Sequence, residues 1–322
     1  MNVFVTRKIM ESGRELLQSA GIEVTEWKEN RELTQEELIA HCLQHDALLS
    51  IGPNKLDAYF LESCSHLLVI ALHSVGYDHV DMKTAKRLNI PIANTPGVLT
   101  DSTADLAFLL LLATSRRAFY HHKTIAAGGW GFSNPSDPSH LGIELRGKTL
   151  GIFGLGNIGF EMAKRCKHAF GMHILYTNRS TNPAAEQELG AEKVPFEELL
   201  RQSDAISVHA NLNNETKEVF NADAFSRMKP SAIFINAARG GIHNEEDLTA
   251  ALTAGTIWGA GLDVTNPEPM SSDSPLLNIP NVSVLPHIGS ATIETRTAML
   301  RLAVENVIAG LRGEVLPNAV KG

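Results

Sequence analysis

The stretch "TLGIFGLGNIGF", residues 149–160, decides the fold of this chain. An apolar run typical of a buried strand leads into a glycine-rich turn, and the helical pattern "FEMAKRCKHAF" runs out of it. The turn, residues 154–159, matches G-x-G-x-x-G, a pattern that is weak alone because glycines also serve ordinary tight turns. The strand before it and the helix after it favour a dinucleotide-binding turn over a purely structural one.

Each glycine of this turn has a physical role in binding a dinucleotide. The first permits the tight turn, the second lets the backbone approach a pyrophosphate, and the third lets the helix pack on the strand. The helix N-terminus then offers free N–H groups and the positive end of its dipole to the phosphates. We therefore expect the cofactor to be bound by Gly154, Gly156, Asn157 and Ile158.

The next strand, within "HILYTNRST" at residues 173–181, predicts which dinucleotide binds. At this strand end an NAD site usually places an Asp or Glu on the adenosine ribose, but here the sequence is Asn178-Arg179-Ser180. An arginine can fork onto phosphate oxygens, whereas a carboxylate would repel a 2′-phosphate. We therefore favour NADPH (NADP+), with these three residues around the 2′-phosphate and NADH as the weaker alternative. A merely solvated loop position for Arg179 is the plain alternative.

Short apolar runs alternate with helical patterns along the whole chain, which predicts an α/β protein with parallel sheets. The runs are nearly all apolar, as in a parallel sheet that is covered on both faces. We expect two Rossmann-like, doubly wound parallel-sheet domains with the active site in the cleft between them. The predicted boundaries place residues 1–98 plus 288–322 in a substrate-binding domain and residues 99–287 in the dinucleotide-binding domain.

Two long helices are expected besides the regular alternation. The first begins near Asp101, where a capping oxygen precedes an apolar face, and runs towards Ala127. It contains the apolar run at residues 106–113, which falls short of the ~18 residues that span a bilayer and predicts a buried helix. The second covers "ATIETRTAMLRLAVENVIAGLRG" and is expected to stop at Gly310 and Gly313.

Composition and charge argue against several classes of partner. The formal net charge of −8 gives no basic field for nucleic acid or an anionic membrane surface. The three cysteines share no close spacing, which indicates neither a disulfide framework nor a zinc site and is typical of a reducing cytoplasm. The pairs His41/His45 and His121/His122 lack a nearby acid or cysteine, so solvated helix faces are favoured over metal sites. We expect a cytoplasmic protein with no metal, nucleic-acid or membrane partner.

Three polar elements follow later apolar runs, at strand ends where open parallel sheets bind their ligands. They are "NAARGG" with Arg239, "GLDVTNPEP" with Asp263 and Glu268, and "LPHIGSAT" with His287. Together with the glycine turn and "SVGYDHVD", they resemble the D-isomer-specific 2-hydroxyacid dehydrogenase family over essentially the whole chain. The motifs most resemble its glyoxylate/hydroxypyruvate reductase branch, which includes 2-ketogluconate reductases.

The resemblance implies NADPH-dependent reduction of small 2-oxo acids, of the glyoxylate or hydroxypyruvate type, to D-2-hydroxy acids. It implies that Arg239 orients the 2-oxo acid, that His287 donates a proton, and that Glu268 pairs with that histidine. These residue types suit hydride transfer, because the alkoxide that forms needs an acid within about 3 Å and a carboxylate partner favours the protonated imidazole. Arginine adds a charge that does not titrate away and a fork that fits a carboxylate.

The resemblance also assigns the other binding residues. The turn that begins at Ser74 can present backbone N–H groups to an anion, and the family places the substrate carboxylate there. The implied substrate-binding residues are Val75, Gly76, Arg239 and Ser290. Beyond the glycine turn and the 2′-phosphate residues, the implied cofactor-binding residues are Thr103, His209, Ala210, Ala237, Ala238, Asp263, His287 and Gly289.

The resemblance further implies a homodimer, because the helix from Asp101 and the loop after it resemble the family's dimerisation element. This branch typically reaches a Trp into the partner's active site, but residues 136–147 hold no aromatic residue, which leaves Leu141 as a candidate lid. A 2-ketogluconate or other 2-oxo acid reductase is one alternative function. A non-enzymatic dinucleotide-sensing scaffold, like the corepressors that resemble this family, is another, and the intact Arg/Glu/His set disfavours it.

Overall fold

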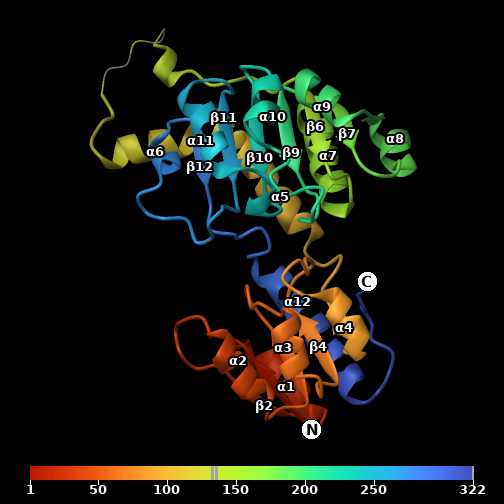
Figure 1. Ribbon diagram of the computed structural model, residues 1–322. Coiled ribbons are helices and arrows are strands. Elements are labelled where there is room, and N and C mark those ends of the chain that lie inside the picture. The colour runs from red at the N-terminus through yellow and green to blue at the C-terminus, as the bar shows by residue number, and fades with distance from the viewer. Residues whose placement is uncertain (132–133, 135–136, 321–322) are drawn as a thin grey trace. The chain divides into compact units, whose positions relative to one another are not determined.

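The computed structural model describes residues 1–131, 134 and 137–320, and the chain divides into two compact units (Figure 1). Unit 1 comprises Met1–Leu99 and Ser290–Gly322, and unit 2 comprises Thr100–Gly289. Each unit is built on its own parallel sheet, so the predicted class of two parallel-sheet α/β domains is confirmed. The roles of the two units and a cleft between them stay predictions.

The sheet of unit 1 is entirely parallel and carries helices on both faces. In pairing order, its strands are β2 (Glu23–Glu26), β1 (Asn2–Val5), β3 (Ala47–Ser50), β4 (Val69–Leu72) and β5 (Ile92–Ala93). One face packs against α1 (Glu11–Ser19) and α12 (Ile293–Leu311). The other packs against α2 (Gln35–Cys42), α3 (Ala58–Ser63) and α4 (Met82–Leu88). The all-apolar strands predicted from the sequence are therefore buried from both sides.

The long C-terminal helix differs in one detail from its prediction. Gly313 follows α12 in the left-handed region, with φ 69°, and ends the helix as expected. Gly310 was expected to stop the helix too, but it lies inside α12, so that prediction is wrong. A Cβ at Gly310 would lie 2.4 Å from Cβ of Val69, so this glycine lets α12 pack closely on β4.

The sheet of unit 2 has seven strands in the order β12-β11-β10-β9-β6-β7-β8, and all of its pairs are parallel. The strands in that order are Val282–Val284, Gly259–Leu262, Ile233–Asn236, Ala205–Val208, Thr149–Phe153, His173–Thr177 and Glu192–Lys193. One face packs against α5 (Thr100–Ser115), α7 (Asn157–Phe170) and α8 (Pro183–Leu189). The other packs against α9 (Phe196–Gln202), α10 (Ala222–Arg227) and α11 (Glu245–Thr253). Three 3₁₀ turns, Pro138–His140, Gly240–Ile242 and Pro275–Asn278, lie in the connections of unit 2.

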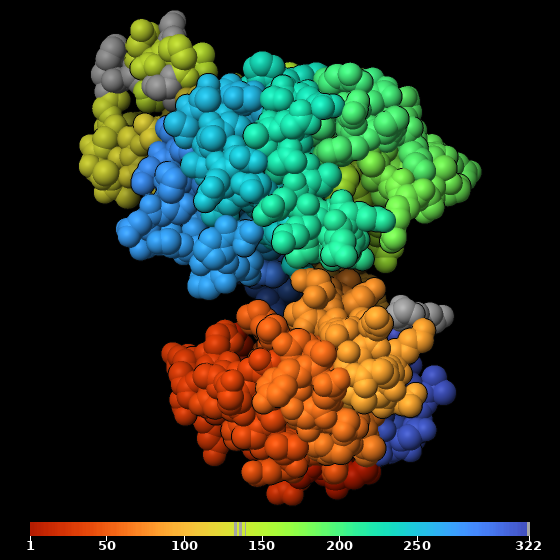
Figure 2. All heavy atoms as spheres, viewed as in Figure 1, coloured from red at the N-terminus to blue at the C-terminus, as the bar shows by residue number. Residues whose placement is uncertain are grey.

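The single helix predicted from Asp101 to Ala127 is wrong, because it is two helices, α5 and α6 (Ala118–Ala126). Arg117 between them has φ 52°, in the left-handed region, which ends the first helix. The carbonyl of Ser115 accepts a hydrogen bond from the N–H of Ile143 at 2.8 Å, so a distant segment satisfies the end of α5. No residue of α6 is buried, and the helix stands out from the body of unit 2 (Figure 2).

Strand order reverses once in each sheet, which marks where ligands bind in open α/β folds. In unit 1 the reversal falls between β1 and β3, and in unit 2 it falls between β6 and β9. The glycine turn follows β6 directly, so it lies at the reversal point of the second sheet. At a reversal point the loops that leave the two neighbouring strands run to opposite sides of the sheet, which leaves room for a ligand at the carboxyl ends of the strands.

The prediction of solvated faces for the histidine pairs is wrong for His41 and His45. The ring of His41 stacks on Phe4 with centroids 4.5 Å apart, and His45 is buried with Nδ1 2.7 Å from the carbonyl oxygen of His41. Their aromatic rings pack on the core because the α2 face meets the sheet there. Within residues 1–131, 134 and 137–320, no group of three potential metal ligands occurs. In the same ranges no helix is long and apolar enough to cross a membrane.

Candidate functional site

The glycine turn has the geometry that a pyrophosphate requires. A Cβ at Gly154 would lie 2.5 Å from the backbone N of Ala210, and a Cβ at Gly159 would lie 2.5 Å from the carbonyl oxygen of Gly154. These two glycines therefore serve close packing. A Cβ at Gly156 would meet no atom within 4 Å, so the backbone there is open to a ligand. Gly156 also caps α7 without a side-chain hydrogen bond, which leaves the first N–H groups of the helix available to phosphate oxygens.

Asn178, at the end of β7, braces the turn itself. Its Oδ1 accepts from the N–H of Leu155 at 2.7 Å, and its Nδ2 donates to the carbonyl of the same residue at 3.2 Å. Asn182 donates to that carbonyl as well, at 3.1 Å. An asparagine can do both because its amide combines an acceptor and a donor, whereas an aspartate could only accept. Its predicted contact with the 2′-phosphate stays a prediction.

Arg179 and Ser180 follow on the exposed side of this turn. Nζ of Lys193, on the edge strand β8, donates to the carbonyl of Arg179 at 3.1 Å and brings a second positive charge to this strand end. Lys193 was not singled out from the sequence, because nothing in the local pattern indicates that β8 pairs beside β7. The end of β7 thus carries positive charge and a hydroxyl, as a 2′-phosphate would require.

His209 and Ala210 follow β9 and pack their backbone against Gly154. Nε2 of His209 lies 2.8 Å from Oγ of Ser207, while its buried Nδ1 has no hydrogen-bond partner among the described residues. Burial lowers the pKa of His209 to about 4, so the ring is neutral at pH 7. A buried polar atom without a partner beside the open turn suits a site that is completed by a dinucleotide.

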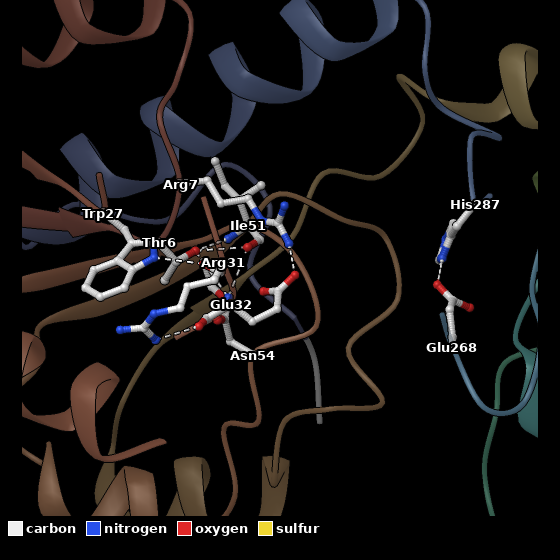
Figure 3. A network of polar contacts seen from close by, with 10 residues as sticks. Thr6, Arg7, Trp27, Arg31, Glu32, Ile51, Asn54, Glu268 and His287 are labelled. Atoms are coloured by element: carbon white, nitrogen blue, oxygen red, sulfur yellow. Dashed lines mark hydrogen bonds and ion pairs between the residues drawn. The ribbon is translucent and has the colours of Figure 1, made fainter. Parts of the chain in front are cut away.

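The catalytic candidates come from the ends of three neighbouring strands. Arg239 follows β10, Glu268 lies in the loop after β11, and His287 follows β12. Because parallel strands end at the same edge of a sheet, these side chains share one edge. Nδ1 of His287 lies 2.6 Å from Oε1 of Glu268, a hydrogen bond shown in Figure 3. A carboxylate can only accept, so the proton of this bond belongs to Nδ1, and Nε2 is left for another partner.

Asp263 holds the backbone of His287 in an unusual conformation. His287 has φ 54°, in the left-handed region that a non-glycine residue rarely adopts. Its N–H donates to the carbonyl of Asp263 at 2.8 Å, and the N–H groups of Ile288 and Gly289 donate to the two carboxylate oxygens at 2.8 Å each. Burial raises the pKa of Asp263 to about 6. The predicted contact of this carboxylate with a nicotinamide amide stays a prediction.

Three predicted cofactor residues meet beside this loop. A Cβ at Gly289 would lie 3.1 Å from Oδ2 of Asp263 and 3.3 Å from Cγ2 of Thr103. Thr103 is buried in the first turns of α5, so these residues converge from three separate segments of unit 2. Ala237 and Ala238 are half-buried at the end of β10, next to Arg239.

The charges of the catalytic set act on one another. Burial acts to raise the pKa of Glu268, but the hydrogen bond and charge of His287, with a further contribution from Arg239, lower it overall. Glu268 is therefore ionised at neutral pH. Nη1 of Arg239 donates to the carbonyl of Ala238 at 2.8 Å, which orients the guanidinium along its own loop. The set thus combines a fixed cation, an ionised carboxylate and an imidazole.

The predicted substrate turn lies in unit 1, after β4. Nδ2 of Asn94 donates to the carbonyl of Val75 at 2.8 Å, and Oγ of Ser74 donates to the carbonyl of Gly76 at 2.7 Å. The carbonyls are thereby turned inward, and no described residue accepts from the N–H groups of Val75 and Gly76. Such a turn suits an anion. Ser290, the remaining predicted substrate residue, opens the second segment of unit 1.

Comparison with known proteins covers the full length of the chain. Residues 108–289 match the family described as "D-isomer specific 2-hydroxyacid dehydrogenase, NAD binding domain". The chain is 43% identical over 320 residues to a glyoxylate reductase of Thermococcus litoralis, covering 99% of this chain and 96% of that protein. It is 42% identical over 323 residues to a glyoxylate reductase/hydroxypyruvate reductase of Mus musculus, with 100% and 98% covered.

A solved structure with the same fold is that of an NADPH-dependent glyoxylate/hydroxypyruvate reductase from Sinorhizobium meliloti in complex with NADP and malonate. The two structures have a TM-score of 0.86 at 33% identity, covering 99% of this chain and 96% of that chain. The open glycine turn at a strand reversal and the polar set at the same sheet edge define a dinucleotide-binding oxidoreductase. The chain belongs to the D-isomer specific 2-hydroxyacid dehydrogenase family, which confirms the predicted resemblance.

Proposed function

We propose that the protein reduces small 2-oxo acids, of the glyoxylate or hydroxypyruvate type, to D-2-hydroxy acids with NADPH as the preferred reductant. The names of the similar proteins support this substrate class. The single observation that carries the proposal is the 2.6 Å hydrogen bond between His287 and Glu268. It lies at the carboxyl ends of the strands, where the loop of Arg239 leaves β10. A binding scaffold would have no need of an imidazole oriented by an ionised carboxylate.

His287 is the proposed proton donor. When bound, the nicotinamide supplies a hydride to the carbonyl carbon of the substrate. The carbonyl oxygen then needs a proton, and Nε2 of His287 donates it, because Nδ1 is engaged by Glu268. The carboxylate fixes the orientation of the ring, while Asp263 fixes the backbone beneath it. This loop therefore orients the proposed proton donor.

Arg239 is the proposed partner of the substrate's negative charge. Its guanidinium stays charged at any working pH and can fork onto a carboxylate or onto the carbonyl oxygen as charge develops there. We propose that the N–H groups of Val75 and Gly76, with Ser290, bind the substrate carboxylate. The inward-turned carbonyls of the turn support that role.

NADPH is the proposed cofactor because no acid occupies the end of β7. Arg179 and Ser180 are exposed there and Lys193 is hydrogen-bonded to the same turn. A related structure in complex with NADP supports the choice. We further propose a homodimer in the cytoplasm. Exposed apolar side chains in and near α5 and α6 favour a surface that a second copy of the chain covers. They are Leu109, Ile125, Trp130 and Leu141.

One panel of initial rates tests this function. Glyoxylate, hydroxypyruvate, pyruvate and 2-keto-D-gluconate are each assayed with NADPH and with NADH. We expect the highest kcat/KM with glyoxylate or hydroxypyruvate and NADPH. A higher value for 2-keto-D-gluconate would select the alternative substrate, and turnover of none of the four would contradict the proposed enzyme class.

A further inference from the structure

The loops of Arg239 and Glu268 touch each other directly. A Cβ at Gly240, next to Arg239, would lie 1.9 Å from the carbonyl oxygen of Thr265, so the two backbones are packed against each other. Only a glycine fits there. Arg239 is proposed to bind the substrate and Glu268 to orient His287, so a shift of either loop by about 1 Å can cost about 100-fold in rate. The backbone contact prevents the loops from moving closer together, but it does not fix how either one is oriented.

Asn236, the last residue of β10, fixes the loop of Arg239 from below. Its Oδ1 accepts from the N–H of Ala238 at 3.0 Å, and its Nδ2 donates to the carbonyl of Arg239 at 2.9 Å. The second hydrogen of Nδ2 points to Nδ1 of His243 at 2.9 Å. Because an amide nitrogen only donates, Nδ1 of His243 must accept, and the ring is neutral with its proton on Nε2. Both Asn236 and His243 are fully buried.

Glu245, two residues after His243 in the chain, reaches the second loop. Nε2 of His243 is buried without a hydrogen-bond partner among the described residues, 3.9 Å from Oε2 of Glu245, and that oxygen accepts from the N–H of Asn266 at 2.6 Å. Asn266 belongs to the loop that carries Glu268. The short segment 243–245 therefore contacts the support of Arg239 at one end and the loop of Glu268 at the other.

We propose that Asn236, His243 and Glu245 form a positioning network that sets Arg239 and Glu268 relative to each other. None of the three acts on substrate, and the inference rests on the proposed roles of Arg239 and Glu268. Burial lowers the pKa of His243 to about 4 and raises that of Glu245, so the acceptor form of the ring persists throughout the neutral range. Phe234 packs on the imidazole with ring centroids 5.7 Å apart and limits its rotation.

Two substitutions at His243 separate positioning from packing. His243→Leu fills the volume but removes the acceptor, which leaves a buried hydrogen of Asn236 without a partner. His243→Asn restores an acceptor, because the amide oxygen takes the place of Nδ1. We expect kcat/KM for glyoxylate to fall about 10- to 100-fold in the leucine variant and to recover to within about 3-fold in the asparagine variant. KM should rise because the loop of Arg239 is displaced, and kcat should fall because the loop of Glu268 is displaced. The Kd of NADPH should stay unchanged.

Leu252→Ala is the matched control. Leu252 is buried in α11 and belongs to the same hydrophobic cluster as Phe234, which packs on His243. Its side chain has no polar atom and makes no hydrogen bond. It should lower Tm at least as much as His243→Leu and leave kcat and KM near the wild-type values. Equal losses of kcat/KM in the leucine variant and this control would contradict the inference, as would an asparagine variant no better than the leucine variant.

Amide hydrogen exchange distinguishes this inference from the proposed function. The amides of Ala238 and Asn266 should exchange faster in His243→Leu than in the wild type, and near the wild-type rate in His243→Asn. This result is expected whether or not the protein turns over any 2-oxo acid. Unchanged protection of both amides in the leucine variant would overturn the network, even if the rate panel supports the enzyme.

Discussion

The two sheets have the same kind of strand reversal, but only one reversal point is left open. In unit 1, Thr6 follows β1 and fills the reversal point: its Oγ1 accepts from the N–H of Ile51 at 2.8 Å and donates to the carbonyl of that residue at 2.9 Å (Figure 3). Asn54 donates to the same Oγ1 at 3.2 Å. In unit 2 the chain leaves β6 through the glycine turn, and at Gly156 in that turn a Cβ would meet no atom within 4 Å.

This difference shows that topology supplies a place for a ligand, while side chains decide whether the place is used. Buried hydroxyl and amide groups satisfy the strand ends of unit 1 within the protein. Glycines leave the strand ends of unit 2 as bare backbone, which can bind phosphate oxygens. The turn of unit 1 that we propose to bind an anion lies one strand further along, after β4.

The largest expected effect comes from removing the proposed chemistry at the carboxyl ends of the strands of unit 2. His287→Ala should lower kcat by about 100- to 10,000-fold, because the proposed proton donor is lost. Tm should change little, since nearly half of the side-chain surface, 47%, is exposed. Steady-state kinetics and a thermal melt measure both. Glu268→Gln is the companion variant, with a smaller loss of kcat; a kcat near the wild-type value in His287→Ala would disprove the assignment.

Filling the open reversal point should be the next largest effect. Gly156→Val adds a side chain where no protein atom lies within 4 Å, so the fold should survive. The Kd of NADPH, measured by fluorescence titration, should rise at least about 10-fold, because the side chain occupies the approach to the backbone. Gly131→Val is the control, since a Cβ there also meets nothing within 4 Å. Cofactor binding that is equally tight in both variants would refute an open site at Gly156.

Opening the closed reversal point of unit 1 should affect stability and not chemistry. Thr6→Val keeps the shape but removes the hydroxyl, which leaves the polar groups of Ile51 and Asn54 without this partner. The free energy of unfolding should fall by about 1–3 kcal/mol in denaturant titrations. Thr253 is an exposed threonine and serves as the control. Thr253→Val should change the free energy of unfolding by less than about 0.5 kcal/mol. A loss of cofactor affinity in Thr6→Val would mean that unit 1 takes part in dinucleotide binding.

The smallest effect concerns which dinucleotide the open site prefers. Arg179→Ala combined with Ser180→Ala should reduce the ratio of kcat/KM for NADPH to that for NADH by about 10-fold, through loss of charge-assisted hydrogen bonds. Asn178 is better left intact, because an aspartate there would lose the hydrogen bond to the carbonyl of Leu155. Lys193→Ala should give a milder change in the same direction. An unchanged ratio in the double variant would argue against Arg179 as a 2′-phosphate ligand.

Much of the site could be predicted because its signals are local. The glycine spacing at residues 154–159 and the strand ends before Arg239 and His287 are each visible within about ten residues of sequence. The break at Arg117 was not visible, because it depends on a hydrogen bond from Ile143, which belongs to a later segment. Gly310 was misjudged for the same reason: its lack of a Cβ serves contact with a strand far away in the sequence.

The sequence by itself determined the α/β class and located the glycine turn, since strand periodicity and motif spacing are short-range properties. The resemblance to the family added the candidate set of Arg239, Glu268 and His287, whose roles stay predictions. Tertiary structure alone decided that the reversal point of unit 1 is closed by Thr6 and that the one in unit 2 is open. It also decided that Asn236 and His243 lie beneath the catalytic loops. The physical reason is that hydrogen bonds and close backbone contacts between segments depend on three-dimensional position, which sequence spacing does not encode.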